Sequence, residues 1–67
     1  MFRREPLRFS LGDRVRNKNP HSAQFGRFGV VARIYMGNPT PFLDVRYDGE
    51  IGLRDNSQNS FELEDKA

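Results

Sequence analysis

The chain has 67 residues and a mass of 7.8 kDa, which limits it to one small domain, because a chain of this length buries only about 60% of its unfolded surface. It contains 36% hydrophobic and 30% charged residues, a balance typical of a folded domain rather than a disordered tail. It has no cysteine, which excludes disulfides, thiolate metal sites, iron–sulfur ligation and a cysteine nucleophile.

The formal net charge is only +2, but the charge is unevenly distributed. Residues 1–35 carry eight basic and two acidic side chains, whereas residues 36–67 carry three basic and seven acidic ones. This asymmetry predicts a basic surface that faces an acidic partner. A charged surface that only keeps a small domain soluble explains the same composition equally well.

Apolar runs in this sequence are short, three or four residues at most, far below the roughly 20 residues that a membrane-spanning helix needs. Arg3 and Arg4 near the start are not followed by an apolar segment, so the pattern of a secretory signal is absent. We therefore expect a protein that stays inside the cell and does not cross a membrane.

The first predicted strand covers residues 11–16, where polar and apolar side chains alternate. Gly12 and Asp13 are expected to form the turn at its start. Val15 then points into the core, and the arginines on either side of it point to solvent. The next segment, residues 17–27, is polar and contains proline and glycine, which predicts a long loop.

The central strand is predicted over residues 28–35, the most apolar and β-branched stretch of the chain. Strict alternation divides this strand into a core face and an outer face. The core face is predicted to hold Phe28, Val30, Ala32 and Ile34, and the other face Val31, Arg33 and Tyr35. Residues 36–41 follow, and their two prolines predict a turn that cannot join a strand ladder.

A third strand is predicted over residues 42–47. Asp48-Gly49 directly after it is a strong signal for a two-residue hairpin with positive φ at both positions, so a fourth strand is expected over residues 51–54. Residues 61–64 are expected to form a short closing strand or a 3₁₀ turn. Together these elements predict an all-β fold, a small SH3-like antiparallel barrel of about five short strands.

This interpretation divides the chain into a basic N-terminal extension (1–10), the barrel (11–64) and a frayed C-terminus (65–67). The predicted core consists of Val15, Val30, Ala32, Ile34, Leu43 and Val45.

No set of residues has the spacing of a catalytic or metal site. His21 is the only histidine, and no carboxylate or hydroxyl nucleophile stands at a fixed spacing from it. The acidic residues lack the pattern of a calcium loop, and no helix start follows the glycines to cradle a phosphate. We therefore expect no catalytic residue, no bound cofactor and no metal.

Basic and aromatic side chains are the remaining candidates for function. Interleaved, they could stack nucleic-acid bases and neutralise phosphates, but a barrel this small needs most of its aromatic side chains for the core. What remains is a set of basic side chains expected on neighbouring strands and the first loop. The candidate partner-binding residues are Arg46, Arg16, Arg14, Lys18, Arg33 and Arg27.

Five segments, taken in chain order, carry a resemblance to a known family. They are Gly12-Asp13-Arg14-Val15-Arg16, Pro20-His21-Ser22, Phe25-Gly26-Arg27-Phe28-Gly29-Val30-Val31-Ala32, Val45-Arg46-Tyr47 and Asn56-Ser57-Gln58-Asn59-Ser60-Phe61. Their order is similar to that in photosystem I reaction centre subunit IV, which has Gly-x-x-Val-Arg, Val-Gly-Thr-Val-Ala and Val-Arg-Phe strands and an Asn-Thr-Asn-Asn-Phe segment. The resemblance covers about three-quarters of the chain, and Ala23-Gln24 stands where the family has Tyr-Trp.

The resemblance implies a non-enzymatic subunit, peripheral to the photosynthetic (thylakoid) membrane on its cytoplasmic or stromal face. Such a subunit contacts the photosystem I core subunits and the iron–sulfur subunit, stabilises the complex and assists the docking of ferredoxin or flavodoxin for electron transport. The arginine that the family associates with ferredoxin docking matches Arg46, and that of the first strand matches Arg16. Since these carriers are acidic, a basic face would raise their encounter rate in a salt-dependent way.

Two other functions remain as alternatives. A KOW-like barrel would bind RNA, or a transcription or ribosomal partner, through the basic residues of strand one and the first loop, although the acidic second half would repel a phosphate backbone. The segment Phe9–Arg16 also resembles the type B, plasmid-borne dihydrofolate reductase. The Val-Gln-Ile-Tyr motif of that enzyme is missing, however, since the corresponding region reads Asp55-Asn56-Ser57-Gln58.

Overall fold

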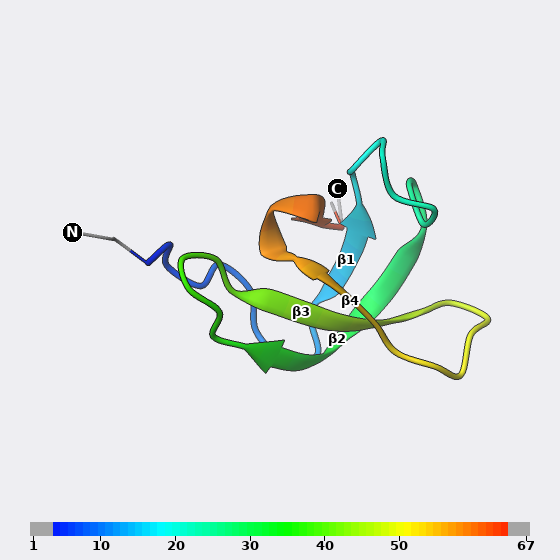
Figure 1. Ribbon diagram of the computed structural model, residues 1–67. Coiled ribbons are helices and arrows are strands. Elements are labelled where there is room, and N and C mark those ends of the chain that lie inside the picture. Colours follow the sequence, from blue (N-terminus) through cyan, green and yellow to red (C-terminus); the bar gives the residue numbers. More distant parts are fainter. Residues whose placement is uncertain (1–3, 65–67) are drawn as a thin grey trace.

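The computed structural model describes residues 4–64, which form a single five-stranded antiparallel sheet (Figure 1). The strands are β1 (Arg14–Asn17), β2 (Phe28–Tyr35), β3 (Phe42–Tyr47), β4 (Arg54–Ser57) and β5 (Phe61–Leu63), and the 3₁₀ helix η1 (Gln58–Ser60) joins the last two. Their order in the sheet is β4-β3-β2-β1-β5. The predicted all-β class is confirmed.

None of the helices in the described part of the chain is long and apolar enough to cross a membrane. The predicted frayed C-terminus, residues 65–67, and the first three residues of the predicted N-terminal extension lie outside the described residues.

The ends of the strands agree with the sequence patterns best at β2, β3 and the start of β5. β2 and β3 have the predicted bounds, and β5 forms where a closing strand was expected. β1 is shorter at its start, because the turn before it continues through Asp13, whose N–H donates to the Ser10 carbonyl at 3.1 Å. Gly12 has a φ of +87°, a value that a residue with a side chain rarely adopts, which confirms its predicted place in this turn.

The predicted core face of β2 is wrong over residues 28–32, and Phe28, which pairs with Arg16, is not part of the core. Val31, assigned to the outer face, is only 1% exposed, whereas Val30 is 37% exposed and Ala32 is also exposed. The cause is an irregularity in the β2–β3 ladder: Val31 pairs with Val45 but Arg33 pairs with Asp44, which leaves Ala32 as an extra residue. Such a bulge shifts the alternation by one residue.

The prediction of a two-residue hairpin after β3 is also wrong. Asp48 and Gly49 do form a turn, in which the Glu50 N–H donates to the Tyr47 carbonyl at 3.0 Å. Only Gly49 has a positive φ, +84°, and no residue other than glycine has a positive φ within residues 4–64, so the hairpin geometry that needs two such residues does not form. The chain instead makes a six-residue loop, 48–53, and β4 begins three residues later than predicted.

The core lies on one face of the sheet. It contains Phe9, Val15, Val31, Leu43, Val45, Tyr47 and Phe61, with Ile34 packed against it. Val15, Leu43 and Val45 are therefore confirmed as core residues. Phe9 shows that the segment before β1 takes part in the fold. Hydrogen bonds hold this segment, among them Glu5 N–H to the Pro39 carbonyl and Gln58 Nε2 to the Pro6 carbonyl.

Candidate partner-binding site

Four of the six predicted binding residues lie on strands. Arg14 and Arg16 are on β1, Arg33 on β2 and Arg46 on β3. Val30 of β2 pairs with Arg14 on one side and with Arg46 on the other, so these two arginines flank one valine on the outer face of the sheet. The other two predicted residues, Lys18 and Arg27, lie at the two ends of the β1–β2 loop.

Three of these six basic side chains are paired with carboxylates of the same chain. The Arg14 guanidinium donates to Asp48 at 2.7 Å and to Glu64 at 3.3 Å. Arg16 bonds to Glu62 at 2.9 Å and Arg27 to Glu50 at 2.7 Å.

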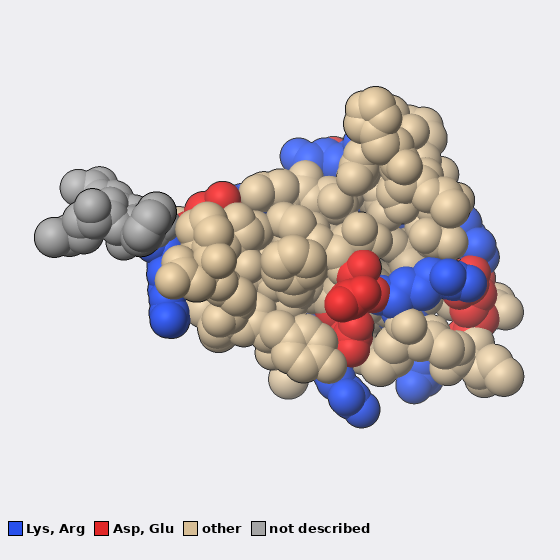
Figure 2. Space-filling view, viewed as in Figure 1, with Lys and Arg blue, Asp and Glu red and all other residues tan. Residues whose placement is uncertain are grey.

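The acidic second half of the sequence thus folds onto the basic first half. Figure 2 accordingly shows acidic and basic side chains interspersed on the face in view, with no large surface of one sign. The uneven charge along the sequence therefore becomes a mixed surface, on which a basic side chain without an acidic partner stands out.

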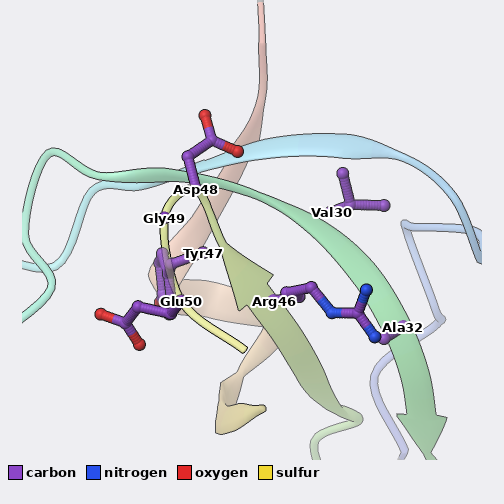
Figure 3. A pocket seen from close by; sticks show the side chains of 7 residues that line it. All are labelled: Val30, Ala32, Arg46, Tyr47, Asp48, Gly49 and Glu50. Carbon is purple, nitrogen blue, oxygen red and sulfur yellow. The ribbon is translucent and has the colours of Figure 1, made fainter. Parts of the chain in front are cut away.

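Arg46 is such a side chain. It is exposed, and no salt bridge connects it to any carboxylate within residues 4–64. Figure 3 shows its side chain running from β3 across to Ala32 on β2, while the carboxylates of Asp48 and Glu50 point away from it. The guanidinium is therefore free to pair with a carboxylate from another molecule.

A shallow hollow surrounds Arg46 on the outer face. Its lining residues are Val30, Ala32, Arg46, Tyr47, Asp48, Gly49 and Glu50. The bulge in β2 contributes directly to this hollow, because it turns both Val30 and Ala32 outward beside the arginine. An exposed apolar surface next to an unpaired planar cation is the composition found at the centre of many protein interfaces.

Lys18 and Arg33 also have no salt bridge within the described residues, but neither lines the hollow. Arg33 stands opposite Asp44 in the β2–β3 register. Among the predicted binding residues, Arg46 alone therefore combines exposure, a place in the hollow and the lack of a salt bridge in the described part of the chain.

The hollow could not be located from the sequence, because its apolar part was assigned to the core. Val31 was the one signal against this assignment, because it is a large β-branched residue on the face that was expected to be solvated. Alternation gives no warning of a bulge within an apolar run, so neither Val30 nor Ala32 was a candidate site residue.

Among residues 4–64, no group of three or more His, Asp or Glu side chains is arranged to hold a metal ion. The chain matches no family model, no curated protein and no solved structure.

The ion pairs around the hollow predict a loss of stability in acid. Hydrogen bonding from Arg14 lowers the pKa of Asp48 from its ordinary 3.8, and hydrogen bonding from Arg54 lowers the pKa of Glu50 from its ordinary 4.5. A carboxylate with a depressed pKa in the folded state stabilises the fold above its unfolded pKa, and this stabilisation is lost as the pH falls through the folded pKa.

We therefore expect a melting temperature that is constant from about pH 7 to pH 5 and falls below about pH 4.5. Circular dichroism melts across this range measure it. The fall should be shallower in 1 M NaCl, which screens exposed ion pairs. A melting temperature that stays constant down to pH 3 would contradict the contribution of these pairs.

Proposed function

We propose that this protein is a non-enzymatic docking module with an SH3-like barrel fold, which binds an acidic protein through the hollow around Arg46. The strand order supports the barrel. β4 and β5 are the two edges of the sheet, yet only the three residues of η1 separate them along the chain, so the edges lie close together. An antiparallel sheet that curls in this way is the usual form of small all-β domains.

The observation that carries the proposal is the unpaired Arg46 beside exposed Val30 and Ala32. Its neighbours Arg14 and Arg27 are already neutralised by Asp48 and Glu50. The hollow therefore offers one strong carboxylate-binding group and an apolar surface rather than a broad positive field. This composition suits a folded acidic protein, whose carboxylates lie next to apolar atoms, better than a phosphate backbone.

The resemblance to photosystem I reaction centre subunit IV gives this docking role a particular form. In it, the protein is a peripheral subunit on the cytoplasmic or stromal face of the photosynthetic membrane. It contacts the core and iron–sulfur subunits, stabilises the complex and presents Arg46 to ferredoxin or flavodoxin. Arg46 is the residue at which the resemblance and the geometry of the hollow agree.

Binding kinetics with purified plant-type ferredoxin and flavodoxin test the proposal. We expect Arg46→Gln to slow association several-fold at low ionic strength and to have little effect at high salt, because steering by an exposed charge is screened. Lys18→Gln is the matched control, since it removes one exposed positive charge outside the hollow. Equal association rates for the two variants at every salt concentration would contradict the role of Arg46.

Loss of function through misfolding is excluded in the same experiment by thermal melts. Arg46 is exposed and has no salt bridge within residues 4–64, so Arg46→Gln should leave the melting temperature unchanged. If neither carrier binds the wild-type protein, the carrier-docking role is wrong. Binding of a structured RNA that is stronger than that of either carrier would favour the KOW-like alternative.

A further inference from the structure

The β3–β4 loop, residues 48–53, projects from the sheet, and its tip carries an apolar side chain in solvent. Figure 1 shows this loop extending away from the strands at the yellow part of the chain. Ile51 at its tip is 97% exposed, the highest value among the exposed large hydrophobic residues. An isoleucine left in water forgoes the free energy that burial of its side chain would provide, so this position is unfavourable for the isolated fold.

The base of the loop is held firmly although its tip is free. Arg27 donates to the Glu50 carboxylate at 2.7 Å and to the Asp48 carbonyl at 3.2 Å. Arg54 donates to the other oxygen of Glu50 at 2.9 Å, and the Asp48 N–H donates to the Phe28 carbonyl at 2.9 Å. These contacts connect the loop to β2 and to the start of β4.

A loop that is held at its base loses little conformational freedom when its tip enters a partner. It also lies beside the hollow, since three of its residues, Asp48, Gly49 and Glu50, are part of the lining. Any protein seated on Arg46 is therefore adjacent to this loop.

From this arrangement we infer that Ile51 is a second, apolar anchor for the protein that docks at Arg46, and that it inserts into an apolar socket next to a carboxylate on that partner. The inference rests on the proposed docking function. It specifies the partner's surface: an acidic side chain that pairs with Arg46, and an apolar depression beside it that receives Ile51.

A lipid surface is the other environment that could bury such a tip. The loop is poorly suited to it, because Ile51 is the one exposed large apolar residue within residues 48–53, and the acidic Asp48 and Glu50 precede it. Segments that enter a membrane surface combine several large apolar residues with lysines and arginines. A protein socket is the occupant that the charges of this loop favour.

Dissociation kinetics distinguish Ile51 from Arg46. We expect Ile51→Ala to accelerate dissociation from the carrier that binds, flavodoxin or ferredoxin, about tenfold. The effect should be the same at low and high salt, because an apolar contact is not screened, whereas Arg46→Gln acts on association at low salt. Leu63→Ala is the matched control, since Leu63 is 56% exposed on β5 and does not line the hollow.

The outcomes separate this inference from the function on which it rests. Unchanged dissociation for Ile51→Ala, together with slower association for Arg46→Gln, would overturn the anchor and leave the docking function in place. If no carrier binds the wild-type protein, both the Ile51 anchor and the docking function are wrong. Flotation of the wild-type protein with phosphatidylcholine–phosphatidylglycerol vesicles that is lost in Ile51→Ala would overturn the protein socket in favour of a lipid surface.

Discussion

Replacing Gly29 with valine is expected to lower the free energy of unfolding by about 3 kcal/mol or more. A Cβ atom at this position would lie 2.5 Å from the Arg46 carbonyl oxygen and 2.6 Å from Cγ1 of Val45. Gly29 pairs with Val15 of β1 on one side and with Tyr47 of β3 on the other, so its backbone cannot move away.

Urea denaturation followed by circular dichroism measures this loss. A domain of this size has a total stability of roughly 3–10 kcal/mol, so the variant should be largely unfolded or have a much lower urea midpoint. Gly52→Val is the matched control, because a Cβ there meets nothing within 4 Å. If the two variants share one midpoint, the close approach of β2 and β3 at Gly29 is wrong.

Replacing Gln58 with leucine is the second change with a large expected effect, about 2–5 kcal/mol. Gln58 is 0% exposed, and its side chain joins the N-terminal segment to η1. Its Oε1 accepts from the Arg8 N–H at 3.1 Å, and its Nε2 donates to the Pro6 carbonyl at 2.9 Å. Leucine has a similar size but leaves both backbone groups without these partners.

The loss at Gln58 should appear in two measurements. The urea midpoint should fall, and trypsin should cleave after Arg8 faster than in the wild-type protein, because the segment that carries Phe9 into the core is released. Gln24→Leu is the control, since the Gln24 side chain makes no hydrogen bond within residues 4–64. Unchanged cleavage after Arg8 would contradict the role of Gln58 as the link to this segment.

How much of the fold the sequence predicts depends on how local the signals are. Alternation and β-branched residues located β2 and β3, and the positive φ of Gly12 agrees with the predicted turn. The structure departs from alternation at Ala32, where pairing with β3 accommodates one extra residue. The position of this extra residue depends on which side chains fill the core opposite Val45, and the alternation pattern of a single strand does not contain this information.

The sequence predicted only part of the candidate site, because its charges were counted without their partners in the fold. Arg46 was identified from the sequence, and it lies in the hollow. Arg14, Arg16 and Arg27 were identified with it, but each pairs with a carboxylate between 23 and 50 residues away in sequence. Such long-range pairs depend on the strand order, so a count of charges along the chain overestimates the basic surface that remains available.

The most direct test of docking at the hollow is a titration of the ¹⁵N-labelled protein with oxidised flavodoxin, followed by NMR. We expect the amide shifts of Val30, Ala32, Arg46 and Gly49 to change most, together with that of Ile51, and these changes to diminish as salt is added. Changes confined to the β1–β2 loop around Lys18, or no changes at all, would contradict the proposal that an acidic protein docks on Arg46.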